Sequence, residues 1–292
     1  MASVTTNLQR DRGRTRWSMV LMTVLMGSVG SLAEATTMGN DTKSKLASVP
    51  PAVWQKLATK KIYFGHQSVG DNILVGVREV LAANPQIKLS VQERAELATP
   101  AKPSLIHSYV GINEQPQTKN DAFAGAVRDK LRGDVDMAFF KYCYIDIGPT
   151  TDSAGLFQTY KKTMDELKRQ NPKVTFIHIT SPLVTAQTGW KGWAKKLLGR
   201  ALGGHADNAR RNEFNDLMHK EYAGKEPLFD LAKLEATRPD GSLVTYEFEG
   251  RRYMSLAPEY TYDGGHLNEA GRKYVAEQLL LFLAEQVARE RT

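Results

Sequence analysis

Cysteine is the scarcest residue of this 292-residue chain, which contains only Cys143. A single cysteine excludes a disulfide framework, and it excludes zinc or iron–sulfur sites built from several cysteines. Beyond residue 35, the sequence also lacks any apolar run long enough to cross a membrane. Hydrophobic residues make up 41% of the chain and charged residues 24%, proportions that exclude a disordered chain, a coiled coil and a collagen-like fibre.

The N-terminus has the pattern of a secretory signal peptide. Four arginines within 10–16 precede the uncharged stretch 17–33, and the small residues Ala33 and Ala35 then form a cleavage-site pattern. No cysteine follows this stretch, which argues against a lipid-anchored lipoprotein, and no adjacent arginines precede it, which favours the general secretion route.

We therefore expect residues 1–35 to be a signal peptide and residues 36–292 to be a single domain, exported to the periplasm or the medium. Retention as an N-terminal membrane anchor is the alternative, although the uncharged stretch is marginally short for a span. After cleavage no stable membrane span is expected.

The positive charge of the chain does not indicate nucleic-acid binding. Residues 1–35 hold four of the 39 basic residues and two of the 32 acidic ones, so the net charge falls from +7 to +5, with 35 basic against 30 acidic residues. The remaining charges alternate in sign along segments such as 161–166, which is typical of solvated helix faces. We therefore expect no nucleic-acid partner.

Short β-prone runs alternate with segments of helical periodicity along the rest of the chain. This order predicts βαβ units, and hence an α/β fold in which helices cover both faces of a mainly parallel sheet. No linker rich in proline, glycine or serine divides the chain. The predicted strands are 61–64, 135–140, 174–179 and 227–231, and the predicted helices are 72–82, 156–169, 210–222 and 268–289.

Functional groups of a parallel α/β sheet gather beyond the carboxyl ends of its strands, and segment 65–70 (GHQSVG) lies at such a point. Its two glycines permit a tight strand-to-helix turn that exposes Ser68 near backbone N–H groups. The alternative is an ordinary turn in which Ser68 caps the helix. The match to a Gly-x-Ser-x-Gly elbow is imperfect, because the upstream glycine stands three residues before the serine.

A second such point is segment 262–271 (YDGGHLNEAG), directly before the last predicted helix. Two glycines between Asp263 and His266 allow the carboxylate to accept a hydrogen bond from the imidazole, which leaves the other ring nitrogen free to take a proton from a hydroxyl nucleophile. Asn268 is placed to cap the following helix. The alternative is a capped turn with a surface histidine.

An early serine, a late Asp-x-x-His and an α/β pattern between them resemble the SGNH/GDSL hydrolases. The resemblance extends over most of residues 36–292 and implies a three-layer α/β/α sandwich with a flavodoxin-like sheet. In that family Ser68 would be the nucleophile, His266 the general base and Asp263 the residue that orients the imidazole. Further similar segments are 135–146, 179–183 and the pattern Asn208-x-x-Arg211-x-x-x-Asn215.

The sequence departs from the family at two blocks. His66 and Gln67 precede the serine where the family has Gly-Asp, and Cys143 and Ile145 fall at the Gly and Asn of its Gly-x-Asn-Asp block. That asparagine donates to the oxyanion, and the loss of one such donor typically slows turnover by about 10²–10³-fold. The donors proposed for the oxyanion are therefore the N–H groups of Ser68 and Gly111, together with Asn113. Further residues expected to line the site are Lys141, Tyr142 and His66, although His66 could equally hold the loop. Tyr144 lies near them in the sequence.

Several other residues are candidates for structural roles. Cys143 follows an apolar strand and is expected to be a buried small hydrophobe. His178 is expected to be a core histidine, and the histidines show no paired ligand spacing, so no metal and no cofactor is expected. The segment 189–200, with Trp190, Trp193 and four basic residues, is either an amphipathic cap or a contact for sugar rings, acidic polysaccharide or a membrane surface.

Three functions are consistent with these features. The first is an exported serine esterase that removes an O-acyl or O-acetyl group from a carbohydrate or a small ester. The second is an O-acyltransferase acting on cell-envelope polysaccharide with the same residues, because the acceptor is decided by the pocket and by water access. The third is a degenerate family member that binds glycan without turnover.

Overall fold

The sheet that organises the chain has six strands, all paired in parallel, in the order β2-β3-β1-β4-β5-β6. The computed structural model describes residues 45–94, 97–98, 100, 102–187 and 203–290. Without the short edge strand β2, the order is the 2-1-3-4-5 order of flavodoxin-like sheets, as predicted. The strands are β1 (Lys61–His66), β2 (Val91–Glu93), β3 (Ser104–Tyr109), β4 (Met137–Phe140), β5 (Thr175–Ile179) and β6 (Leu228–Phe229).

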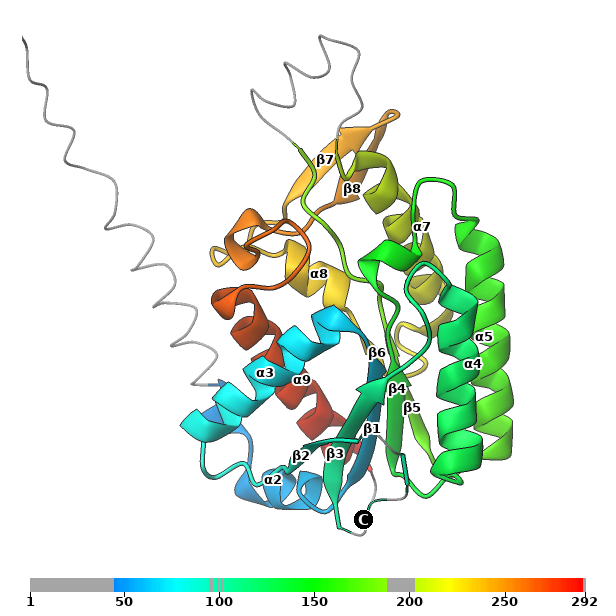
Figure 1. Cartoon of the computed structure of the whole chain (residues 1–292). Helices are drawn as coiled ribbons and strands as arrows, with labels where there is room; N and C mark the ends of the chain where they lie inside the picture. The colour runs from blue at the N-terminus through cyan, green and yellow to red at the C-terminus, as the bar shows by residue number, and fades with distance from the viewer. Residues whose placement is uncertain (1–44, 95–96, 99, 101, 188–202, 291–292) are drawn as a thin grey trace, which may run out of the picture.

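Helices cover both faces of this sheet, which confirms the predicted three-layer sandwich (Figure 1). One layer contains α2 (Pro51–Leu57), α3 (Ser68–Ala83), α8 (Leu231–Ala236) and α9 (Glu269–Arg289). The other layer contains α4 (Pro116–Gly125), which continues into the π-turn η1 (Ala126–Lys130), α5 (Ser153–Gln170) and α7 (His205–Tyr222).

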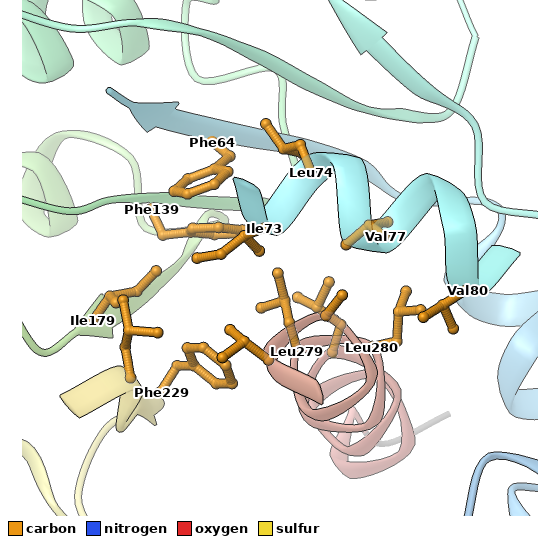
Figure 2. Packing of buried hydrophobic residues seen from close by; sticks show 14 of the residues in the cluster. Phe64, Ile73, Leu74, Val77, Val80, Phe139, Ile179, Phe229, Leu279 and Leu280 are labelled. Atoms are coloured by element: carbon orange, nitrogen blue, oxygen red, sulfur yellow. The ribbon is translucent and has the colours of Figure 1, made fainter. Parts of the chain in front are cut away.

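The hydrophobic core lies on both sides of the sheet because successive strand residues point to opposite faces. Along β1, Ile62 and Phe64 pack under α3 and α9, whereas Tyr63 packs under α4 and α5. Figure 2 shows Phe64 and Phe139 meeting Ile73 of α3 above Leu279 of α9. Burial on both faces explains why these strands are nearly continuous apolar runs in the sequence.

A two-stranded hairpin, β7 (Thr245–Phe248) and β8 (Arg251–Met254), was not predicted. Its turn residues Glu249 and Gly250 have φ values of 50° and 74°, and positive φ at both central positions is the requirement of a type I′ turn. Tyr246 and Tyr253 of the hairpin pack against Ala209 of α7. Two 3-10 turns, η2 (Tyr144–Asp146) and η3 (Pro258–Tyr260), complete the elements.

Several predicted boundaries shift in ways that bear on the site. The helix expected from residue 72 begins at Ser68, because its polar and glycine-containing first turn lies outside the apolar periodicity. The strand expected over 227–231 ends at Phe229, and Leu231 already begins α8, capped by the Asp230 carboxylate.

No helix within the described ranges is long and apolar enough to cross a membrane. The predicted signal peptide, residues 1–35, and the whole tryptophan-containing segment 189–200 lie outside the described residues.

Candidate active site

The loops that carry the predicted site residues leave the sheet at one edge. Strands β3, β1 and β4 are parallel neighbours, so the segments after their carboxyl ends converge there. Ser68 follows β1, Gly111 follows β3 and Tyr144 follows β4, whereas His266 lies in the loop that leads into α9.

The structure brings Ser68, His266 and Asp263 into one hydrogen-bonded row. The Oδ2 atom of Asp263 lies 2.7 Å from Nδ1 of His266, and Nε2 of the same ring lies 3.0 Å from Oγ of Ser68. Because an ionised carboxylate only accepts, Nδ1 carries the proton of the neutral imidazole and Nε2 is the acceptor. The Ser68 hydroxyl therefore donates to the nitrogen that would receive its proton.

Asp263 is held in its ionised form by the loop that carries it. Partial burial opposes ionisation, but the N–H groups of His266 and Gly265 donate to Oδ1 at 2.8 and 2.9 Å. Together with the imidazole, these hydrogen bonds lower the pKa of Asp263 to about 2. Thr261 closes the loop by donating from its hydroxyl to the His266 carbonyl at 2.6 Å.

Ser68 is the first residue of α3, after the extended residue Gln67. At this position the helix offers no acceptor to the Ser68 N–H, which is therefore available to a ligand. The flanking glycines serve close packing rather than unusual φ values: a Cβ at Gly65 would lie 2.8 Å from Val110, and one at Gly70 would lie 2.3 Å from the Cβ of His66.

Helix α3 is joined directly to the segment that carries His266. The Leu267 N–H donates to Oδ1 of Asn72 at 3.1 Å, one helical turn after Ser68. Farther along, a Cβ at Gly76 would lie 2.3 Å from the carbonyl oxygen of Arg272, so α3 and α9 are in backbone contact there. Neither Asn72 nor Gly76 belongs to a chemical motif, so the sequence carries no signal for either role.

Gln67 fastens the loop after β3 to the Ser68 turn. Its Nε2 donates to the carbonyls of Val110 and Gly111 at 3.1 and 3.0 Å. Gly111 has a φ of +59°, and a Cβ there would lie 2.6 Å from the backbone of Lys119, so only glycine fits. Gln67 therefore positions the Gly111 loop beside the Ser68 turn.

Beneath this loop lies a fully buried ion pair between Lys119 and Asp146. Lys119 also donates to the side-chain amide oxygen Oδ1 of Asn113 at 2.9 Å. Asp146 accepts from the backbone N–H groups of Glu114 and Cys143. The pair therefore joins the loop after β3 to the loop after β4. The Asn113 side chain is exposed, with its amide oxygen turned toward Lys119.

Three side chains expected to line the site are instead buried beneath it. His66 and Lys141 are 1% exposed and Tyr142 is 2% exposed. His66 contacts His107, Lys141 donates to the Tyr142 carbonyl at 3.3 Å, and the Tyr142 hydroxyl donates to Asn120. Burial by the surrounding elements corrects the expectation that these three contact substrate, and gives them structural roles.

Tyr144, by contrast, reaches the imidazole. Its hydroxyl lies 3.5 Å from Nε2 of His266, and its ring meets the imidazole edge-on at a centroid distance of 5.5 Å. A Cβ at Gly265 would lie 2.9 Å from the Tyr144 ring, so glycine at this position permits the approach. On the far side, Tyr262 stacks over His266 and is 69% exposed.

Helix α7 fixes the loops after β4 and β5 through the predicted Asn-Arg-Asn pattern. Asn208 exchanges two hydrogen bonds with the backbone of Val184, and Asn215 does the same with Ser181. Arg211 donates to the Tyr144 carbonyl at 2.8 Å. The pattern thus holds backbone in place rather than touching the reacting groups.

Two expectations for structural residues are confirmed. Cys143 is buried, and His178 is a core histidine that pairs with the Tyr160 hydroxyl at 2.8 Å and with Glu226 at 3.1 Å. Among the residues that the structure describes, no group of three or more histidine, cysteine, aspartate or glutamate side chains is arranged to hold a metal ion.

A hollow of about 300 Å³ borders the row on its Asp263 side. Polar groups of the segment after β5 face the residues around Asp263 across it. The lining residues are Tyr144, Val184, Thr185, Gln187, Gly203, Asp263, Gly264 and Gly265.

No protein-family model and no curated protein sequence matches the chain. Solved structures similar to it include a Streptococcus pneumoniae protein whose name refers to platelet activating factor (14% identity, 86% of this chain and 94% of that one, TM-score 0.47). A second is the periplasmic domain of a Salmonella Paratyphi A lipopolysaccharide acetyltransferase (11% identity, 74% of this chain and 80% of that one, TM-score 0.40). A third is a Slackia heliotrinireducens protein provisionally described as an SGNH hydrolase (16% identity, 78% of this chain and 98% of that one, TM-score 0.43).

Proposed function

We propose that this chain is an exported serine hydrolase of SGNH type that cleaves an O-acyl ester, most simply an acetyl ester, of a carbohydrate or small alcohol. The observation that carries the proposal is the hydrogen-bonded row from Ser68 through His266 to Asp263. Each member has the protonation that acyl transfer needs, with a hydroxyl donor, an imidazole acceptor and an ionised carboxylate.

In the first half of the reaction, Ser68 Oγ attacks the ester carbonyl while its proton passes to Nε2 of His266. The imidazolium that forms is stabilised by the Asp263 carboxylate across the 2.7 Å hydrogen bond. His266 then gives the proton to the leaving alcohol, and an acyl-enzyme remains. In the second half, His266 takes a proton from water as that water attacks the acyl carbon. It then returns the proton to Oγ of Ser68 as the carboxylic acid leaves.

The oxyanion formed in each half would accept hydrogen bonds from the N–H groups of Ser68 and Gly111. Gln67 supports this arrangement by fixing the Gly111 loop against the serine turn. The Asn113 amide is proposed as the third donor, since its oxygen is engaged by Lys119 and its Nδ2 is left for a ligand. No step in this sequence calls for a metal, so chelators are expected to leave turnover unchanged.

The proposal is tested with 4-nitrophenyl acetate and a fluorophosphonate probe. Wild type should hydrolyse the ester and become labelled, whereas Ser68→Ala should do neither. Ser48→Ala is the matched control, since the exposed Ser48 hydroxyl donates to the Lys45 carbonyl ahead of α2, outside these loops, and the variant should keep both activities. Equal hydrolysis by wild type and Ser68→Ala would refute the assignment, and failure of wild type to label would favour a glycan-binding protein.

The choice between hydrolase and acyltransferase depends on the acceptor. The imidazole is 25% exposed at its side chain and Asp263 is 41% exposed, so water reaches the row directly, which favours hydrolysis. Adding a polyol acceptor to the assay tests the alternative, because a transferase would yield acylated polyol in place of acetate.

Export rests on the sequence pattern of residues 1–35. Expression of the full chain in a bacterial host should give a periplasmic or secreted product whose mass corresponds to loss of this segment. A full-length product in the membrane fraction would instead indicate an N-terminal anchor.

A further inference from the structure

Tyr144 is the only phenol that the described structure places within hydrogen-bonding reach of the His266 imidazole. Its hydroxyl lies 3.5 Å from Nε2, the atom that also lies 3.0 Å from Ser68 Oγ. The two hydroxyls therefore share one nitrogen. That nitrogen is where a proton passes to the leaving group, which makes the neighbouring phenol a candidate participant in the same transfer.

The position of Tyr144 is fixed from three sides. Gly265 leaves room for the ring, which a Cβ would meet at 2.9 Å. Arg211, itself buried, holds the Tyr144 carbonyl and places its guanidinium 6.0 Å from the ring centre. The imidazole closes the third side with its edge-on contact. A phenol held in this way keeps its hydroxyl at one place beside Nε2.

The phenol also borders the hollow of about 300 Å³ on the Asp263 side of the row. The residues that line the hollow include Thr185 and Gln187, whose side chains carry a hydroxyl and an amide, which suits a hydroxyl-bearing alcohol. The proposed oxyanion donors come from the other loops, after β1 and β3. Tyr144 therefore lies on the side of the leaving alcohol rather than on the side of the oxyanion.

We propose that Tyr144 is a further catalytic residue, whose hydroxyl donates a hydrogen bond to the leaving-group oxygen while His266 protonates that oxygen. The proposal rests on the proposed function. In the step, the bond from Ser68 Oγ to the acyl carbon forms and the bond from that carbon to the alcohol oxygen breaks. The serine proton reaches the alcohol through Nε2, and Tyr144 keeps its own proton.

The Tyr144 hydroxyl keeps its proton at neutral pH and can therefore donate a hydrogen bond there. Partial burial, and then the negative charge of Asp263, raise the pKa of Tyr144 above its usual value, so the hydroxyl stays protonated at neutral pH.

The test compares acetyl esters whose leaving groups differ in basicity. Phenyl and 4-nitrophenyl acetate have nearly the same shape, but nitrophenoxide leaves without help and phenoxide does not. For Tyr144→Phe, kcat/KM should fall by less than about twofold on 4-nitrophenyl acetate and by about tenfold or more on phenyl acetate and ethyl acetate, the size of effect expected for a hydrogen bond to developing charge. Since the readout is a ratio of two rates on one preparation, partial unfolding of the variant does not change it.

Tyr262→Phe is the matched control, because it removes a hydroxyl from the other ring that lies against His266 and should change all three rates by one common factor. An equal loss on all esters for Tyr144→Phe, or no loss on any, would overturn the role given to Tyr144. The proposed function fails separately: Ser68→Ala would then retain the wild-type rate on every ester.

Discussion

His66 Nε2 lies 3.0 Å from His107 Nδ1, and both imidazoles are buried. The series of hydrogen bonds continues from His107 to Arg78, which is exposed. The guanidinium of Arg78, which can only donate, lies 3.0 Å from Nε2 of His107 and therefore fixes the protons of both rings. His107 must donate from Nδ1 to His66, and His66 must then donate from Nδ1 to the Gln67 carbonyl at 3.2 Å. Arg78 thus sets the hydrogen-bonding pattern of His66, two residues before Ser68.

Both imidazoles of this series should make folding stability depend on pH. Burial lowers the pKa of His66 to about 3, and burial followed by the charge of Arg78 lowers that of His107 to about 4. In the unfolded chain the histidine pKa values are near 6.5. Between about pH 4 and 6.5 the unfolded chain therefore binds more protons than the folded chain, so stability should fall as pH falls from about 6.5 toward 4.

His107→Gln tests this pair, because glutamine can still accept from Arg78 and donate to His66 but does not titrate. The variant should cost about 1–2 kcal/mol at pH 7, yet lose less of its stability than wild type between pH 7 and pH 5. Urea unfolding at the two pH values measures both quantities. An unchanged pH dependence would show that His107 is not neutral in the folded protein.

Asp263→Asn should separate orientation of the imidazole from binding. Asparagine removes the charge that stabilises the imidazolium and offers an amide donor that favours the wrong tautomer, so kcat should fall by about 10³–10⁴-fold with little change in KM. Steady-state rates on 4-nitrophenyl acetate measure the loss. Asp240→Asn, a change in an exposed turn, is the matched control and should retain full activity. A loss below tenfold would remove Asp263 from the proposed mechanism.

Gly76→Ala should lower stability and activity together, although the residue is two turns from Ser68. The added methyl meets the backbone of Arg272 at 2.3 Å and must push α3 away from α9, which typically costs about 1–3 kcal/mol. The same displacement lengthens the contact between Ser68 and His266, so kcat should fall. Gly148→Ala, where a Cβ meets nothing within 4 Å, should leave both unchanged. Full activity of a destabilised Gly76→Ala would show that the contact between Ser68 and His266 does not depend on the spacing of α3 and α9.

The buried pair of Lys119 and Asp146 predicts a difference between single and double variants. Lys119→Met leaves Asp146 buried and unpaired and should destabilise the protein by about 3–5 kcal/mol. Lys119→Met combined with Asp146→Asn should recover part of that loss, because no isolated charge remains. Thermal unfolding of wild type, each single variant and the double variant measures the coupling. Additive losses in the double variant would mean that the two charges do not interact.

The sequence was sufficient to predict the layers of the fold and the convergence of Ser68, Asp263 and His266, because each has a local signal. Strands buried on both faces read as apolar runs, and Asp263 and His266 are separated by only two glycines. Ser68 and His266 could be paired only through the family resemblance, since 198 positions separate them.

Gln67 and Asn72 could not be recognised as parts of the site in the same way, and neither could the contact of Tyr144 with His266. The approach of Tyr144 to His266 depends on the absence of a Cβ at Gly265, and Asn72 matters only through the N–H of Leu267. His66 shows the opposite error: its place beside Ser68 in the chain suggested contact with substrate, yet the alternation along β1 and the first turn of α3 bury its ring.

The docking of α9 on α3 has a consequence for how activity arises during folding. Ser68 begins α3, and His266 lies just before α9, so 198 positions separate them in the sequence. Such a non-local contact cannot form before both ends of the domain have met. Intermediates that retain the sheet but lack a docked α9 would be inactive. Recovery of esterase activity during refolding should therefore lag behind recovery of secondary structure.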